Sequence, residues 1–290
     1  MSRRPALTVS EERGVRTLHV GGEAIQSSMR LSDPYALELD YTRCMTSFLL
    51  FHPRPRRALK IGLGGGSLVK FFWRRLPWVR TRVVELDERV VAVAREQFHL
   101  PPDDERLCVE VGDGAEALAP ECCDLLAVDA FADEHPPAAL VSQPFFDAAW
   151  LALEAPGAMV MNFMDDDPKL DERLQRIERA FGGTVLALPA LYDPNVIVLA
   201  LKGTPRAIEW DLLYRRAHAL EKRYGIPYPR YVPRLKRMNR HDARSLRPHR
   251  GNRRPGRRLR VRGRAGVPAG PRQAAGPPRP VARALRLSVS

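Results

Sequence analysis

The chain has 290 residues, of which 44% are hydrophobic, and a formal net charge of +13. This length allows one large domain or two small ones, each with a sizeable core. No stretch reaches the roughly 18 uncharged apolar residues of a membrane span, and no apolar run follows the basic N-terminus. We therefore expect neither a membrane protein nor a signal peptide. The four cysteines have no metal-type spacing, which predicts free thiols in the cytoplasm and no metal site.

The excess of positive over negative charge lies entirely in the last fifty residues. Residues 241–290 contain 14 arginines, no lysine and a single acid, Asp242, so residues 1–240 are electrically balanced. Seven prolines, six glycines and no aromatic residue predict a disordered tail, because too little apolar surface is present to offset the entropy of ordering. Two explanations stay open for it. The tail contacts RNA, DNA or anionic lipid through phosphates, or it is an out-of-frame product of a GC-rich gene.

Residues 1–240 alternate between apolar runs and helical patterns, which predicts an α/β fold with a parallel sheet covered on both faces. A β-hairpin is expected first, from Leu7–Ser10 and Thr17–Val20 with Gly14 at the turn, followed by a helix over Tyr41–Phe51. The expected strands are Ala58–Leu63, Arg82–Leu86, Leu107–Val111, Asp124–Asp129 and Ala158–Phe163, closed by an antiparallel pair, Thr184–Leu188 and Val196–Leu201. The expected helices are Leu68–Leu76, Arg89–Phe98, Phe145–Leu153, Leu170–Phe181 and Trp210–Tyr224.

Three loops that follow successive strands carry the candidate binding residues. Ligands of doubly wound sheets bind beyond the carboxyl ends of the strands. The loop 62–67 permits close backbone approach through its glycines, Gly62, Gly64, Gly65 and Gly66. Glu85 stands 23 residues after Gly62, where this architecture places an acceptor for ribose hydroxyls. Asp113, before Gly114, follows the third strand and suits an adenine amino group. Together they favour a nucleoside ligand over a nicotinamide cofactor.

These residues resemble the spermidine synthase (polyamine aminopropyltransferase) family, which shares the class I S-adenosylmethionine-dependent methyltransferase fold, a Rossmann-like doubly wound sheet. The resemblance extends from about Gln26 to Asn239. It rests on the glycine loop and on these segments: Gln26-Ser-Ser-Met, Tyr41-Thr-Arg-Cys-Met, Val-Val-Glu85-Leu-Asp, Val-Gly-Asp113-Gly, Val-Asp129-Ala-Phe, Gln143-Pro-Phe-Phe-Asp and Asn195-Val-Ile-Val. It implies a small N-terminal β-hairpin domain with a linking helix (1–52) and a catalytic domain (53–240). The composition adds the disordered tail (241–290) as a third region.

The resemblance also implies an activity and a set of residue roles. Decarboxylated S-adenosylmethionine would donate its aminopropyl group to a diamine such as putrescine, leaving methylthioadenosine, with no metal and no tightly bound cofactor. Asp129 occupies the position of the catalytic aspartate, which would hold the amine and take its proton. Gln26 would join the donor site, Tyr41 and Asp133 would contact the amine, and a homodimer is possible.

Three departures from the family pattern keep other functions open. Gly65 stands where the family has an aspartate near the donor's amino group, Ala132 where it has a second aspartate, and Arg43 where it has a glutamate. The first alternative is therefore a methyltransferase that uses intact S-adenosylmethionine. The second is a catalytically silent binding protein whose arginine tail contacts nucleic acid.

Overall fold

The computed structural model describes residues 5–22, 25–131, 135–205 and 207–248. An antiparallel sheet of three strands comes first: β1 (Leu7–Glu12), β2 (Val15–Val20) and β3 (Ile25–Arg30). The predicted hairpin is confirmed, and Arg13 and Gly14 at its turn both have positive φ. The third strand was not predicted because Ser27 and Ser28 interrupt its apolar pattern, although both serines are buried.

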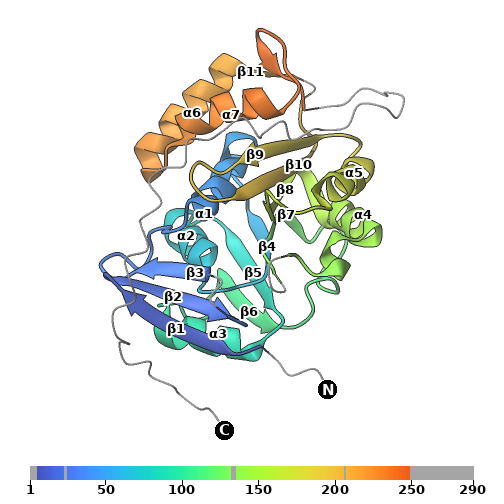
Figure 1. The fold of residues 1–290 in the computed structure, drawn as a ribbon. Helices are drawn as coiled ribbons and strands as arrows, with labels where there is room; N and C mark the ends of the chain where they lie inside the picture. Colours follow the sequence, from blue (N-terminus) through green and yellow to red (C-terminus); the bar gives the residue numbers. More distant parts are fainter. Residues whose placement is uncertain (1–4, 23–24, 132–134, 206, 249–290) are drawn as a thin grey trace.

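A mixed sheet of seven strands forms the centre of the molecule (Figure 1). Its order is β6-β5-β4-β7-β8-β10-β9, in which neighbours among the first five strands run parallel and β10 runs antiparallel to both of its neighbours. These strands are β4 (Arg57–Ile61), β5 (Arg80–Glu85), β6 (Leu107–Val111), β7 (Cys123–Val128), β8 (Leu153–Met164), β9 (Val185–Pro189) and β10 (Asn195–Lys202). The sequence predicted all seven strands, including the antiparallel pair that closes the sheet.

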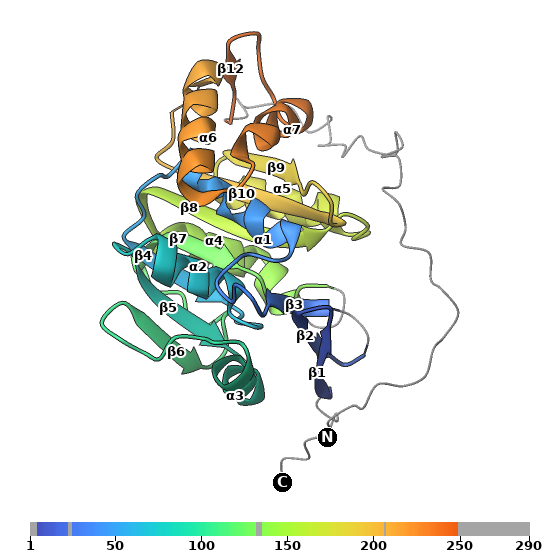
Figure 2. The same cartoon turned by 90° about the vertical axis from the view of Figure 1, so that its left-hand side faces the viewer.

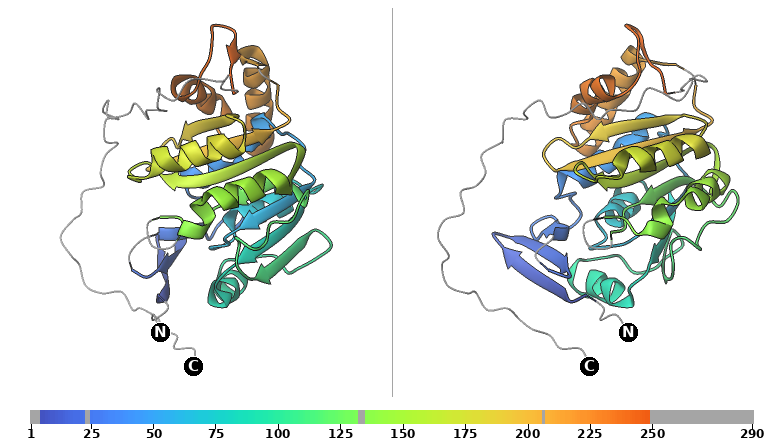
Figure 3. Two further views of the ribbon diagram at one scale, coloured as in Figure 1. Left: turned by 90° about the vertical axis from the view of Figure 1, so that its right-hand side faces the viewer. Right: turned by 45° about the vertical axis from the view of Figure 1, so that its right-hand side comes forward.

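Helices cover both faces of this sheet, as the fold class requires (Figures 2 and 3). One face carries α1 (Asp40–Met45), the 3-10 helix η1 (Thr46–Leu50), α2 (Ser67–Arg75), α3 (Glu88–Gln97) and α6 (Trp210–Tyr224). The other carries the short η2 (Ala138–Val141), α4 (Gln143–Ala152) and α5 (Leu170–Ala180). The single helix predicted over Tyr41–Phe51 is divided at Thr46, whose hydroxyl donates to the Arg43 carbonyl over 2.6 Å.

The chain continues past residue 240 as regular structure. After η3 (Tyr228–Arg230), α7 (Tyr231–Met238) packs on β9, and Asn239 pairs with both backbone groups of Ala187 over 2.8 Å, which covers this edge strand. Then β12 (Ser245–Leu246) pairs with β11 (Ile208–Glu209). The expectation of a disordered tail beginning at residue 241 was therefore wrong for residues 241–248. These residues are ordered because Leu246 is fully buried and its strand pairs with β11. The rest of the tail lies outside the described residues.

Within the described ranges, none of the helices is long and apolar enough to cross a membrane. Over those same ranges, the His, Cys, Asp and Glu side chains form no group of three that could hold a metal ion.

Candidate active site

The glycine loop joins β4 to α2 at the edge where the parallel strands end. Gly62 has a φ of +82°, and a Cβ placed on it would lie 2.3 Å from the backbone oxygen of Asp129. Only glycine fits there, because the backbones that follow β4 and β7 touch at this point. Gly66, at a φ of +73°, precedes the first turn of α2. The loop therefore presents backbone rather than side chains at the sheet edge.

The N-terminal sheet covers this loop through β3. The backbone oxygen of Gln26 lies 3.8 Å from the position that a Cβ on Gly64 would take. A Cβ on Gly65 would lie 2.7 Å from Phe98 and 2.8 Å from the Ser27 hydroxyl. Gly65 is thus enclosed by packing, and an aspartate at this position would need Phe98 or Ser27 to move.

Glu85, the last residue of β5, is fixed by the loop that it faces. Its Oε2 accepts a hydrogen bond from the Leu63 N–H over 2.7 Å, and its Oε1 accepts from the Asp87 N–H over 3.0 Å. The carboxylate is therefore oriented by two backbone donors, and each oxygen keeps a further lone pair for a hydroxyl donor.

The third loop lies beside it, after β6. Asp113 is exposed, and its Oδ1 accepts from the Ala115 N–H over 2.8 Å. Gly114 packs against β4 so closely that a Cβ would lie 2.3 Å from an Ile61 methyl group. Two large apolar side chains are exposed near these carboxylates: Leu86 at 71% and Val111 at 56%. This edge therefore offers carboxylates beside uncovered apolar surface.

Asp129 follows β7 and is held by a polar network from the neighbouring strands. The Asn162 side-chain amide on β8 donates to Asp129 Oδ1 over 3.0 Å. The Asn195 amide on β10 in turn donates to Asn162 Oδ1 over 3.0 Å. Both asparagines are buried, whereas the Asp129 side chain is 14% exposed. One carboxylate oxygen is thereby fixed, and the group still reaches the surface of the site.

A buried lysine lies beneath the same carboxylate. Lys60 on β4 is 2% exposed, and its ammonium donates to the carbonyl oxygens of Gly62 over 2.6 Å and Ile61 over 3.1 Å. Its Nζ is 4.0 Å from Asp129 Oδ2, beyond hydrogen-bond distance. Burial lowers the pKa of Lys60, and the charges of Asp129 and Glu85 partly offset this effect. The Lys60 ammonium thus binds the backbone at the start of the glycine loop and attracts the carboxylates of Asp129 and Glu85.

Tyr41 approaches the site from α1. Its backbone N–H donates to Asp193 Oδ2 over 2.9 Å. Burial raises the pKa of Tyr41 well above its usual value, and the charges of Asp129 and Asp193 raise it further, so the phenol stays protonated at neutral pH. Arg43, two residues further on, donates to the carbonyl oxygens of Leu37 over 2.6 Å and Glu38 over 3.0 Å. The other expected amine contact, Asp133, lies outside the described residues.

The sequence-predicted residues that the structure describes thus lie together at one edge of the sheet, and the structure adds three that were not predicted. Lys60 and Asn162 lie within expected strands, and Asn195 begins β10; none of the three was given a role in the site. The sequence feature that could have indicated them is a polar residue, Lys60 or Asn162, near the end of an otherwise apolar strand. Buried amides and ammonium groups require partners, and here the partners include Asp129.

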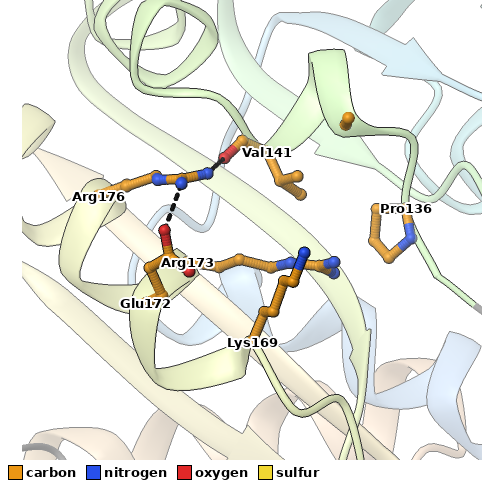
Figure 4. Close-up of a pocket in the computed structure, with 7 residues that line it drawn as sticks. Pro136, Val141, Lys169, Glu172, Arg173 and Arg176 are labelled. Atoms are coloured by element: carbon orange, nitrogen blue, oxygen red, sulfur yellow. Dashed lines mark hydrogen bonds and ion pairs between the residues drawn. The ribbon is translucent and has the colours of Figure 1, made fainter.

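A separate cavity of about 290 Å³ lies between α5 and the segment around η2 (Figure 4). It is lined by Pro136, Ala138, Val141, Lys169, Glu172, Arg173 and Arg176. Two of its cations are already engaged. Arg176 pairs with Glu172 and donates to the Val141 carbonyl, and Arg173 pairs with Asp167. None of the sequence-predicted site residues that the structure describes lines this cavity.

Comparison with known proteins decides the family. A polyamine aminopropyltransferase of Chromobacterium violaceum is 37% identical over 241 residues, which are 82% of this chain and 92% of that protein. The enzyme of the same name from Neisseria meningitidis serogroup A is 37% identical over 238 residues, 81% of this chain and 90% of its own length. The chain belongs to the polyamine aminopropyltransferase family. This is an enzyme family, as the sequence motifs predicted, although no family model matches the chain.

Solved structures agree with this membership at the level of the fold. A probable spermidine synthase from Corynebacterium glutamicum superposes with a TM-score of 0.62 at 21% identity, over 82% of this chain and 94% of that one. Human methyltransferase-like protein 13, in complex with SAH, superposes with a TM-score of 0.58 at 24% identity. The match covers 64% of this chain and 93% of that one. The chain thus has the Rossmann-like fold that the sequence predicted, preceded by the small antiparallel sheet.

Proposed function

We propose that this member of the family transfers the aminopropyl group of decarboxylated S-adenosylmethionine to a diamine such as putrescine. The observation that carries the proposal is the position of Asp129. Its backbone contacts the glycine loop at Gly62, its Oδ1 is fixed by Asn162, and its charge acts on Tyr41. A carboxylate placed between a nucleoside loop and a tyrosine suits an amine that attacks a nucleoside-bound carbon.

The donor would bind along the edge formed by β4, β5 and β6. Backbone groups of Gly62, Gly64, Gly65 and Gly66 would approach it closely, with Gln26 covering the loop. Glu85 would accept from the ribose hydroxyls, because both of its oxygens are already oriented. Asp113 and Gly114 would face the adenine, whose flat ring would cover exposed apolar surface at Leu86.

The chemistry requires a neutral amine, whereas a free diamine is doubly protonated at neutral pH. Asp129 would accept a proton from the near ammonium and hold the nitrogen towards the donor. The nitrogen then forms a bond to the carbon next to the sulfonium as the carbon–sulfur bond breaks. The bonding electrons pass to sulfur, which leaves methylthioadenosine neutral. Because the phenol of Tyr41 stays protonated, it can donate a hydrogen bond but cannot serve as the base.

Two observations favour a second candidate, a methyltransferase that uses intact S-adenosylmethionine. The glycine loop lacks a carboxylate at Gly65, and the ammonium of Lys60 lies beneath the loop. Both features would tolerate a carboxylate on the donor. The two candidates differ in the donor that they select, so the donor is the quantity to measure.

Calorimetric titration with the decarboxylated and the intact donor separates the two candidates. We expect the decarboxylated donor to bind about tenfold more tightly, because Asp129 would repel a carboxylate on the intact donor. Glu85→Gln is expected to weaken both donors by a similar factor, whereas Glu105→Gln, an exposed residue outside these loops, leaves both unchanged. Tighter binding of the intact donor would instead support the methyltransferase.

A further inference from the structure

We propose that Asp193 is the second carboxylate of the amine pocket and binds the ammonium at the far end of the diamine whose near nitrogen faces Asp129. The inference rests on the proposed aminopropyl transfer and identifies the residue that selects a dicationic acceptor. Asp193 lies in the β9–β10 loop, outside the segments by which the chain resembles its family. Along the sequence, Arg43 and Ala132 occupy positions that are acidic in the family pattern, and Asp193 would supply an acid that the chain lacks there.

The sheet order brings Asp193 to the correct edge. Because β10 runs antiparallel to β8, the start of β10 lies at the edge where β7 and β8 end, and Asn195 pairs there with Met164. Only β8 separates β7 from β10. Neighbouring strands are about 4.8 Å apart, so the strand ends next to Asp129 and Asp193 are separated by about 10 Å. A short diamine with an ammonium hydrogen bond of about 2.8 Å at each end fits such a span.

Tyr41 connects the two carboxylates. Its N–H donates to Asp193 Oδ2 over 2.9 Å, and its phenol lies within the electrostatic influence of both Asp129 and Asp193. Across the residues that the structure describes, the side-chain hydrogen bonds include none to the Tyr41 hydroxyl or to Asp193 Oδ1, and Asp193 is bonded through its Oδ2. A phenol and a carboxylate oxygen beside a second carboxylate form a suitable site for an alkylammonium group.

The position of Asp193 is fixed by α1. Asp40 at the start of this helix is 5% exposed, and its Oδ2 accepts from the N–H groups of Leu191 and Tyr192. The bond from the Tyr41 N–H to Asp193 adds a third attachment. Residues 191–193 of the loop are thus hydrogen-bonded to Asp40 and Tyr41 of the helix. The distance between Asp193 and Tyr41 is therefore set by the helix, as expected for a residue that measures acceptor length.

The nearby cations do not neutralise Asp193. Arg43 donates to the carbonyls of Leu37 and Glu38, and Arg230 donates to the Tyr192 hydroxyl. The ammonium of Lys60 is bonded to the carbonyls of Gly62 and Ile61. In the described part of the chain, no ion pair joins Asp193 to an Arg or Lys side chain within 4.0 Å. The charge of the half-buried Asp193 is therefore available to a cationic substrate.

The test is steady-state kinetics of the full chain with putrescine and with n-butylamine, which has one charge. Asp193→Asn keeps an acceptor oxygen for the Tyr41 N–H and removes the negative charge. We expect the KM for putrescine to rise about tenfold, with kcat changed less than twofold and butylamine turnover unchanged. Asp166→Asn, which removes an exposed acid on the neighbouring β8–α5 loop, is the matched control and should leave all values unchanged.

A second readout is independent of turnover. Calorimetry measures putrescine binding to the complex of the enzyme with methylthioadenosine. About tenfold weaker binding in Asp193→Asn supports the inference, even if the wild type transfers no aminopropyl group and the proposed function fails. The inference is overturned if Asp193→Asn binds and uses putrescine like the wild type. It is equally overturned if Asp166→Asn loses as much affinity as Asp193→Asn does.

Discussion

At the scale of single residues, Gly62 joins the fold to the site. A side chain at this position meets two separate obstacles, a φ of +82° and the backbone oxygen of Asp129 at 2.3 Å. Gly225 has a similar φ of +72°, but a Cβ there would have nothing within 4 Å. Substituting Gly225 therefore tests the free-energy cost of positive φ alone, whereas substituting Gly62 adds the cost of a steric clash.

We predict that Gly62→Ala lowers the free energy of unfolding by about 3 kcal/mol, and Gly225→Ala by about 1 kcal/mol. In both variants, an alanine must adopt a left-handed backbone conformation, which lowers stability. Only Gly62→Ala also forces apart the backbones that follow β4 and β7. Urea denaturation followed by circular dichroism measures both values. Equal losses in the two variants would mean that the contact between Gly62 and Asp129 contributes nothing.

The sequence predicted the residues at this scale that stand at strand ends. Gly62, Glu85, Asp113 and Asp129 each follow or end an apolar run, and the parallel topology gathers such positions at one edge. Lys60 and Asp193 could not be predicted in the same way. Lys60 lies inside a strand, and its contact with Asp129 depends on the pairing of β4 with β7. The place of Asp193 depends on β10 running antiparallel to β8.

At the scale of elements, a second buried lysine joins α2 to the end of α3. Lys70 is 1% exposed, and its ammonium donates to the Phe98 carbonyl over 2.7 Å. Burial lowers the pKa of Lys70 to about 8. Between this value and the usual lysine pKa of about 10.4, the unfolded chain binds a proton that the folded protein has released. Stability must therefore rise with pH across this interval.

We predict that the wild type gains up to about 3 kcal/mol in stability relative to Lys70→Met as the pH rises from 8 to 10.5. Lys70→Met keeps the aliphatic packing and removes the titrating group. Urea titrations of both proteins at several pH values give the difference directly. A difference that stays constant over this range would show that Lys70 titrates normally in the folded state.

Elements with a strong period could be predicted, and those that depend on distant partners could not. The apolar runs within β7 and β8 predicted a sheet buried on both faces, and α6 was predicted with its observed bounds, Trp210–Tyr224. In α7, Pro233 lies within the first turn, where it is tolerated but weakens the helical signal. Two-residue strands such as β11 and β12 carry no periodic signal at all.

At the scale of the whole molecule, the two ends of the described chain are built onto the central sheet in different ways. The N-terminal sheet covers the glycine loop through β3, so it contributes to the candidate donor site. The segment after α6 packs on the far edge, where α7 and Asn239 close β9. The charge that dominates the composition lies in the last fifty residues, and the described site is built from the electrically balanced part of the chain.

The most direct test of the central claim follows the products of the reaction. The full chain is incubated with decarboxylated S-adenosylmethionine and putrescine, and mass spectrometry measures methylthioadenosine and aminopropylated putrescine. We predict equal amounts of both products, and a rate that falls at least about 100-fold in Asp129→Asn while donor binding is retained. Donor binding without product from any di- or polyamine would contradict the account, as would a fully active Asp129→Asn variant.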